Sequence, residues 1–358
     1  MLSSCNQEDP GGIQGTGGPS TSPTPPPPTQ GGGLTMTTAR GSHSATLLVG
    51  GRVLIAGGFG DGLKQLSSAE IYDPSAGTFS ATGNMSTARA QHVAVRLADG
   101  KVLIAGGSAG GSNTANVVGA EIYDPAAGMF TPTGNMVSNA RVASALLLSD
   151  GRVIIAEDGN NAEVYDPATG TFALTGAYST PTLIVDTAAL LPDGTVLVVG
   201  CAAACTIGST DVFDPKTGTF SPTGPRLGWG DESTATPLTD GTVLFVEEDG
   251  APPAIGEIYD AASGRFTEIA SGASTDPSFT ATRLPDGTVL LAGGQLTGGN
   301  GSPSAELYTP ATRTFAPAAP LALGRHEHTA TLLPDGTVLI AGGFSVWPTP
   351  TASAEIYR

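Results

Sequence analysis

The chain has 358 residues and carries 15 Lys and Arg against 32 Asp and Glu, which gives a formal net charge of −17. This acidic balance argues against nucleic acid and against an anionic membrane surface as partners, because both select basic proteins. No apolar run approaches the roughly 20 residues that a transmembrane helix needs. The 51 glycines and 28 prolines are typical of a turn-rich all-β chain.

Residues 1–33 differ in composition from the rest of the chain. Gln14–Gly33 consists almost entirely of Gly, Ser, Thr and Pro, so we expect a disordered, extended tether. The preceding Leu2–Cys5 (LSSC) resembles a bacterial lipobox, although the apolar segment that normally precedes one is missing. A lipidated Cys5 predicts an extracytoplasmic protein, either a cell-envelope lipoprotein or secreted, that meets the membrane only through its lipid. The alternative is a chance cysteine in a disordered tail.

Residues 34–358 repeat one pattern seven times. In the first copy an apolar strand at 44–49 is followed by a turn, a second strand at 53–56 that ends in two glycines, a third strand at 69–72 and a fourth at 78–79. β-Branched residues and Asp-Gly or Asp-Pro turns at fixed offsets favour strands over helices. The turn glycines recur every 43 to 51 residues, at Gly51, Gly100, Gly151, Gly194, Gly241, Gly287 and Gly336. This period predicts an all-β, seven-bladed β-propeller of four-stranded antiparallel blades, which we expect to be monomeric.

The repeat resembles the kelch family in its details. The glycine pair after the second strand, the Tyr of the third strand, the aromatic residue of the fourth and the Arg-x-x-His at 40–43 and 89–92 all follow the kelch pattern. The repeat has LPDGTVL at 333–339 and Phe instead of Trp in the fourth strand. This version resembles a bacterial one and is similar to the kelch-type propeller of galactose oxidase. That resemblance implies the fold over residues 34–358.

The resemblance does not extend to catalysis. Galactose oxidase-type chemistry uses copper held by two Tyr and two His, with one Tyr cross-linked to a Cys. This chain has no Tyr-His dipeptide, and its two cysteines beyond the first lie in one short segment. We therefore expect no enzyme of that type, and no serine–histidine–acid set is visible either.

Ring closure is the least regular part of the predicted propeller. The seventh copy ends at its third strand, so its fourth strand must come from the start of the domain. The segment just before Leu34 is the expected donor, and its sequence at 30–33 (QGGG) is a poor strand former. The last blade is thus expected to be weak at its outer edge.

Residues that recur in every copy are expected to be structural. The third-strand carboxylates should form hydrogen bonds between blades, together with four arginines. The carboxylates are Glu70, Glu121, Glu163, Asp211, Glu257, Glu306 and Glu355, and the arginines are Arg40, Arg89, Arg226 and Arg325. The recurring Tyr and Phe residues are expected to form the core between blades.

Candidate binding residues lie where the repeat is broken. The third and fifth copies replace the glycine pair with acids, and further acids and a Trp occur nearby, all on the face of long, variable loops where binding is usually found. They are Glu157, Asp158, Asp186, Trp229, Asp231, Glu232, Glu247, Glu248 and Asp249. Converging carboxylates would bind Ca²⁺ or attract a basic partner; a solvated acidic rim is the alternative. We otherwise expect no cofactor.

Histidines and cysteines form two smaller groups. His43, His92 and His328 occupy one repeat position in three consecutive blades and are weak candidates for a transition-metal site. Cys201 and Cys205 form either a disulfide in an exported protein or a pair of free thiols.

Two functional hypotheses follow from the sequence. The preferred one is an exported propeller that binds a protein or carbohydrate ligand through its variable-loop face. The alternative is a metal-dependent or carboxylate-based enzyme, carbohydrate-active or oxidase-like, with its site at the central pore mouth.

Overall fold

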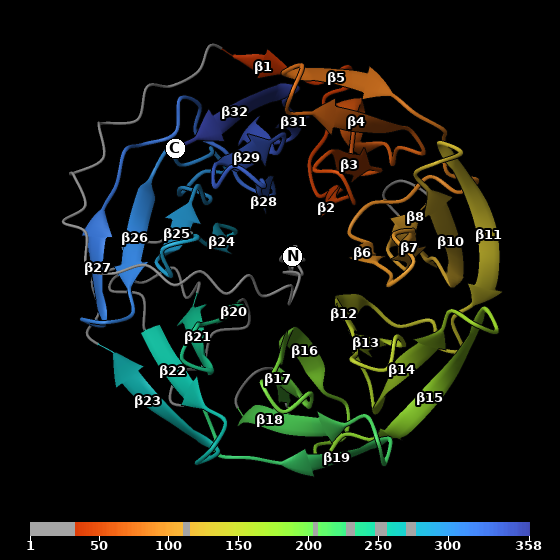
Figure 1. Ribbon diagram of the computed structural model, residues 1–358, viewed down its shortest axis with the longest axis vertical. Coiled ribbons are helices and arrows are strands. Elements are labelled where there is room, and N and C mark those ends of the chain that lie inside the picture. Colours follow the sequence, from red (N-terminus) through yellow and green to blue (C-terminus); the bar gives the residue numbers. More distant parts are fainter. Residues whose placement is uncertain (1–32, 110–114, 203–206, 227–232, 248–255, 270–276) are drawn as a thin grey trace.

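The computed structural model describes residues 33–109, 115–202, 207–226, 233–247, 256–269 and 277–358. They form seven four-stranded antiparallel sheets that follow one another around a central axis (Figure 1). The described residues contain almost no helix, only the 3₁₀ turn η1 (Asp61–Leu63). The predicted seven-bladed all-β propeller is confirmed. The predicted tether, residues 1–33, lies almost entirely outside the described residues and stays a prediction.

Each blade runs from an inner strand to an outer strand. The first four blades are β2 (Ser44–Leu47), β3 (Val53–Ala56), β4 (Ala69–Asp73) and β5 (Thr78–Ala81); β6 (Val93–Arg96), β7 (Val102–Ala105), β10 (Gly119–Asp124) and β11 (Met129–Asn135); β12 (Val142–Leu147), β13 (Val153–Glu157), β14 (Asn161–Asp166) and β15 (Thr171–Ala177); and β16 (Ile184–Leu190), β17 (Val196–Ala202), β18 (Ile207–Asp214) and β19 (Thr219–Pro222). The last three are β20 (Ser233–Pro237), β21 (Thr242–Glu247), β22 (Gly256–Asp260) and β23 (Arg265–Ile269); β24 (Thr280–Arg283), β25 (Val289–Ala292), β26 (Ala305–Thr309) and β27 (Thr314–Pro317); and β28 (Thr329–Leu332), β29 (Val338–Ala341), β32 (Ser353–Tyr357) and β1 (Leu34–Thr35).

Turn chemistry fixes the ends of these strands. At the turn between the third and fourth strands of the first blade, the Asp73 carboxylate accepts the Ser75 amide at 2.9 Å and the Asp73 carbonyl accepts the Gly77 amide at 2.8 Å. Gly77 has φ +64°, a conformation that favours glycine. All such turns lie on one face of the ring, because antiparallel order brings the first-to-second and third-to-fourth turns to the same end.

The N-terminal segment closes the ring, as predicted, but the donor lies further along the chain than expected. β1 pairs with β32 through Leu34↔Ala354 and Thr35↔Ser353. The expected donor at 30–33 lies outside the described residues except for Gly33, which is not in a strand. Leu34 and Thr35 are better strand formers than the glycines that precede them, so pairing begins at the first side chains that can pack.

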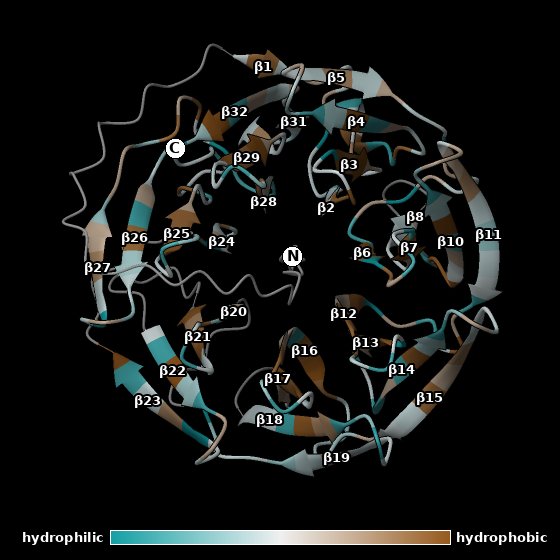
Figure 2. Cartoon of the chain, viewed as in Figure 1, coloured by the Kyte–Doolittle hydropathy of each residue, from teal (hydrophilic) through white to brown (hydrophobic). Residues whose placement is uncertain are grey.

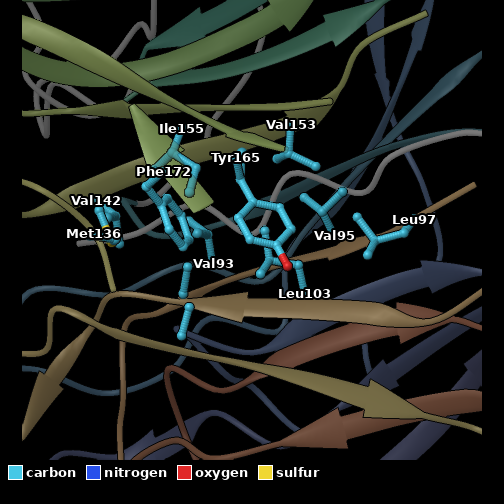
Figure 3. Close-up of a cluster of buried hydrophobic side chains, with 13 residues drawn as sticks. Val93, Val95, Leu97, Leu103, Met136, Val142, Val153, Ile155, Tyr165 and Phe172 are labelled. Atoms are coloured by element: carbon cyan, nitrogen blue, oxygen red, sulfur yellow. The ribbon is translucent and has the colours of Figure 1, made fainter. Parts of the chain in front are cut away.

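The hydrophobic core is divided among the spaces between successive blades. Each of seven clusters combines residues from two neighbouring blades. In the cluster between the second and third blades, Val95 and Leu103 face Tyr165 and Phe172 (Figure 3). Apolar residues concentrate in second strands such as β3 and β25, whereas outer strands such as β11 and β19 are paler (Figure 2). A blade therefore depends on both neighbours for burial.

The variable-loop face carries additional short elements. The loop between the second and third strands contains β8 (Ser108–Ala109) and β9 (Ala115–Asn116) in the second blade, and β30 (Phe344–Val346) and β31 (Thr349–Pro350) in the seventh. Isolated bridges connect the loops of adjacent blades, including Asn300↔Val346 between the sixth and seventh. The loops of these two blades are therefore held in fixed positions.

Candidate functional site

The repeated carboxylates hold the linkers between blades. Glu70 accepts the backbone amides of Thr37 and Thr38 at 2.6 and 3.1 Å, and it also accepts the Thr37 hydroxyl at 2.8 Å and the Arg40 guanidinium at 2.9 Å. Both side chains are 0% exposed. Arg89–Glu121, Arg325–Glu355 and Arg226–Glu257 repeat the pair at 3.1, 3.1 and 3.3 Å. The predicted structural role of these residues agrees with this geometry.

The three repeat histidines join neighbouring inner strands. The Nε2 atoms of His43, His92 and His328 lie 3.0, 2.9 and 3.0 Å from the hydroxyl groups of Thr329, Ser44 and Thr280, each in the preceding blade. Burial is the largest cause of a low pKa in all three, and it lowers the pKa of His92 to about 3. The rings are therefore neutral and engaged one by one with hydroxyl groups.

The first glycine of each pair makes room for the next blade. A Cβ added to Gly57 would lie 2.5 Å from the Arg89 carbonyl oxygen and 2.7 Å from the Cε1 atom of His92. Gly342 has the same relation to Arg40 and His43 across the ring closure. The glycine pair and the histidine of the kelch pattern are thus two halves of one inter-blade contact.

The third blade departs from this arrangement. It has Ala140 where the second blade has Arg89, and Glu157 where the second blade has Gly106. The Ser138 hydroxyl donates to Glu157 at 2.7 Å, and the Ser138 amide donates to Glu163 at 2.6 Å. Burial, opposed by the Ser138 hydrogen bond and reinforced by the charges of Glu163 and Asp158, raises the pKa of Glu157 to about 8. A protonated carboxyl thus occupies the region where other blades have a guanidinium.

Two further predicted acids form ion pairs with arginines. Asp158 binds the Arg141 guanidinium through two bonds of 2.9 Å and accepts the Val185 amide at 2.9 Å, which ties the third blade to the fourth. Asp186 lies 3.5 Å from Arg226, and both side chains are at most 2% exposed. The structure therefore places Glu157, Asp158 and Asp186 in separate local contacts.

The other predicted positions are covered only in part. Trp229, Asp231, Glu232, Glu248 and Asp249 lie outside the described residues, as do Cys5 and Cys205, and Glu247 is placed only as the last residue of β21. Cys201 is disulfide-bonded. Pairing of Cys201 with Cys205 stays a prediction.

An exposed apolar patch on the variable-loop face was missed by the sequence analysis. Leu296, Val346 and Trp347 are 39%, 56% and 43% exposed. The Trp347 amide donates to the Gly299 carbonyl at 3.1 Å, and the indole lies 4.8 Å from the Phe344 ring, which is itself buried. One signal was available, because Trp347 is one of only two tryptophans and lies in a loop that no other copy matches. We call these three residues the loop patch.

The described residues do not supply a set of metal ligands. Among them, no three His, Cys, Asp or Glu side chains come close enough to hold one ion. Three of the recurring tyrosines are also engaged, since Tyr123, Tyr165 and Tyr259 hydrogen bond through their hydroxyl groups to threonines of neighbouring blades at 2.8 to 3.0 Å. A copper site of two Tyr and two His does not fit these positions. Within the same residues no helix is long and apolar enough to cross a membrane.

Comparison with known proteins agrees with the geometry. Residues 40–86 match the family model of the kelch motif, and the described residues form a propeller of seven four-stranded blades. A novel fungal alcohol oxidase of the AA5 family, solved in complex with copper, has a similar structure. Its TM-score is 0.72 at 19% identity, over 92% of this chain and 76% of that one. The expected galactose oxidase-like propeller is thus confirmed as a fold.

These likenesses do not by themselves select a function. In total 988 chains of solved structures match, and a fold shared so widely hosts many activities. No curated protein matches the sequence.

Proposed function

We propose that this propeller is an exported, lipid-tethered binding module that holds a protein partner on its variable-loop face. The observation that carries the proposal is the loop patch, in which an exposed indole and two aliphatic side chains stand on hydrogen-bonded loops of two adjacent blades. Tryptophan is enriched among residues that dominate interface affinity. Loops fixed before binding lose little entropy when a partner docks.

Three aliphatic and aromatic side chains together favour a protein over a glycan. A sugar needs hydrogen-bonding groups beside a stacking ring. The other two side chains of the loop patch, Leu296 and Val346, offer only apolar surface to a ligand that contacts Trp347. A glycan ligand remains an outcome that the experiment below separates.

The proposed location rests on the N-terminus and on the disulfide. The lipobox-like Leu2–Cys5 and the tether behind it suit attachment to a membrane surface. A disulfide at Cys201 suits an oxidising compartment. Expressed in a bacterium behind the apolar signal segment of a known lipoprotein, the chain should enter the membrane fraction, and Cys5→Ser should release it; retention of the variant would contradict lipidation.

The alternative of an enzyme at the pore mouth draws no support from the described acids. Glu157 is 1% exposed, so it does not reach a solute. Asp158 and Asp186 are already engaged by Arg141 and Arg226. Incubation with Ca²⁺, Cu²⁺ and Zn²⁺ tests the metal-dependent version, which requires a rise in melting temperature with one of these ions.

Binding to panels of envelope proteins and of glycans tests the loop patch. Trp347→Ala should weaken a protein hit at least tenfold, a size typical of a buried tryptophan anchor. Val49→Ala is the matched control, because Val49 is 72% exposed at a turn on the opposite face. Equal affinity of both variants would overturn the proposed face, and a hit only among glycans would overturn the protein partner.

A further inference from the structure

The outer strand of the seventh blade covers only part of the strand beside it. β1 pairs with Ser353 and Ala354 at the start of β32, whereas β29 pairs with β32 on its inner side as far as Tyr357. In Figure 1 β1 is a short arrow next to β32 at the rim of the ring. No strand of the described residues pairs with the outer side of Glu355–Tyr357. We call these three residues the open edge.

The first blade shows what a complete outer strand does at this position. There β5 pairs with β4 from Glu70↔Ala81 to Asp73↔Thr78. Glu70 is the counterpart of Glu355, because each pairs on its inner side with the third residue of the second strand. A complete fourth strand would therefore lie against the whole open edge and use its outward backbone groups, which are otherwise a template for another chain.

An aromatic contact that recurs around the ring is not made by the described residues of the seventh blade. In the first six blades the aromatic residue of the third strand contacts the Phe of the fourth, with ring centroids 4.7 to 5.0 Å apart. Those third-strand residues are at most 2% exposed. Tyr357 holds their position in the seventh blade but is only partly buried. The surface of this ring is therefore available to an aromatic side chain from outside the blade.

The side chains of the open edge are held in place by the rest of the propeller. Glu355 is paired with Arg325 at 3.1 Å. Ile356 packs against the core cluster between the seventh and first blades, and Tyr357 against the cluster between the sixth and seventh. The Tyr357 hydroxyl is hydrogen-bonded to the backbone of Ala319. An incoming strand would thus meet a fixed surface and lose little free energy to ordering it.

The segment that precedes β1 has unsuitable residues for this position. The linker at 34–40 corresponds to the linker at 83–89, so Gln30 has the repeat position of Phe79. Three glycines follow Gln30, and glycine is unfavourable in strands. Residues 1–33 contain no aromatic residue at all. A segment that carries an aromatic side chain therefore fits the open edge better than the residues next to it in the chain.

We propose that the open edge binds an extended segment of another protein, which adds to β32 as an antiparallel strand and places an aromatic side chain against Tyr357. Strand addition takes its affinity from main-chain hydrogen bonds and its specificity from alternate side chains. Aromatic pairs across neighbouring strands add to the affinity. The fourth strands of this chain define the partner's chemistry: an uncharged segment centred on Thr-Phe, as in residues 78–81 (TFSA).

This surface is separate from the loop patch. The open edge lies on the outer rim of the ring, whereas the loop patch lies on the loops that join second and third strands. The proposal therefore does not depend on the proposed function, and Trp347→Ala distinguishes the two surfaces.

Fluorescence anisotropy of the full chain with a labelled peptide of residues 77–83 (GTFSATG) tests the proposal. The peptide should bind, and the same peptide with Phe79→Ala should bind at least tenfold more weakly. Trp347→Ala in the protein should leave both affinities unchanged. Absence of binding, or equal affinity of the two peptides, would overturn the proposal. Loss of binding in Trp347→Ala would place the peptide on the loop patch and overturn it equally.

A variant that fills the open edge from within the chain gives a second measurement. The changes Gln30→Phe, Gly31→Ser and Gly32→Ala, made together, give residues 29–32 the sequence of residues 78–81. The melting temperature should rise, because the added strand completes the blade, and the affinity for the peptide should fall at least tenfold. Undiminished affinity in this filled variant would mean that the peptide binds elsewhere and would overturn the proposal.

The same three kinds of substitution further upstream provide the matched control. Gln14→Phe, Gly15→Ser and Gly17→Ala should bind the peptide as the wild type does and leave the melting temperature unchanged. A chain that lacks residues 1–32 should also bind the peptide. Binding by that shortened chain but not by the full chain would show that the open edge is covered by the protein's own N-terminal segment, which would overturn the proposal of an external partner.

Discussion

Replacing Glu157 by glutamine should stabilise the protein in alkaline solution and leave it unchanged in acid. Glutamine keeps an oxygen that accepts the Ser138 hydroxyl but cannot ionise. In the wild type the folded carboxyl holds its proton up to a pKa of about 8, whereas the unfolded one loses it near 4.5. The raised pKa therefore contributes stability that is present below pH 4.5 and is lost as the pH rises through 8.

The size of the effect follows from the two pKa values. Moving the pKa of a carboxyl from 4.5 to about 8 corresponds to a ceiling of about 5 kcal/mol. Local relaxation and entry of water weaken the burial penalty, so we expect on the order of 2–3 kcal/mol at pH 8.5. The free energy of unfolding of Glu157→Gln should exceed that of the wild type by this amount at pH 8.5, and by almost nothing at pH 4.5.

Urea unfolding followed by circular dichroism between pH 4.5 and 8.5 measures the difference. Melting temperatures should be recorded in parallel, because a repeat array can depart from two-state behaviour. Glu268→Gln is the control, since it makes the same substitution at a carboxylate that is exposed on β23. A constant difference between Glu157→Gln and the wild type across this range would refute a buried, protonated carboxyl in the third blade.

Three further predictions concern the inter-blade contacts. Burial lowers the pKa values of His43, His92 and His328 below 6.5, so in acid the unfolded chain binds more protons than the folded one. The stabilising contribution is complete above pH 6.5, and as the pH drops further the free energy of unfolding should decrease by up to about 1.4 kcal/mol per pH unit for each histidine. His92→Gln should reduce this slope in urea titrations. Gly57→Ala should cost about 3 kcal/mol, because its Cβ meets Arg89 and His92 and adds overpacking to a strained φ, whereas Gly62→Ala, at φ +65° in open space, should cost about 1 kcal/mol; equal losses would contradict the contact. Removing residues 1–35 deletes β1 and should lower the melting temperature well below that of a chain lacking only 1–32, and identical melting would contradict closure by Leu34 and Thr35.

The fold could be predicted because its information is local and repeated. A turn such as Asp73–Gly77 dictates its own geometry, and seven copies of it confirm one another. Strand β3, expected at 53–56, lies at Val53–Ala56. Closure was harder, because β1 is only two residues long and pairs with a strand more than 300 residues away, which no local pattern encodes.

The side-chain contacts of the candidate site could be predicted only in part. The repeat shows that Glu157 replaces a glycine, yet it does not show that Ala140 leaves the buried Glu163 without an arginine. That conclusion requires the positions of the third strand and the linker relative to each other, which only the structure provides. Trp347 escaped notice for the opposite reason: its loop has no counterpart in other copies, so comparison between copies says nothing about it.

Arg96 and Arg283 show how repeat analysis can be extended. Compared along the chain, both are ordinary arginines next to leucines. Compared at one repeat position around the ring, they are two cations in an apolar circle, because each inner strand contributes the same position to the axis. In a propeller the unit of comparison is therefore a layer of seven residues rather than a segment. A uniform layer indicates a structural role that all blades share, and a broken layer marks the blades whose contacts differ from the rest.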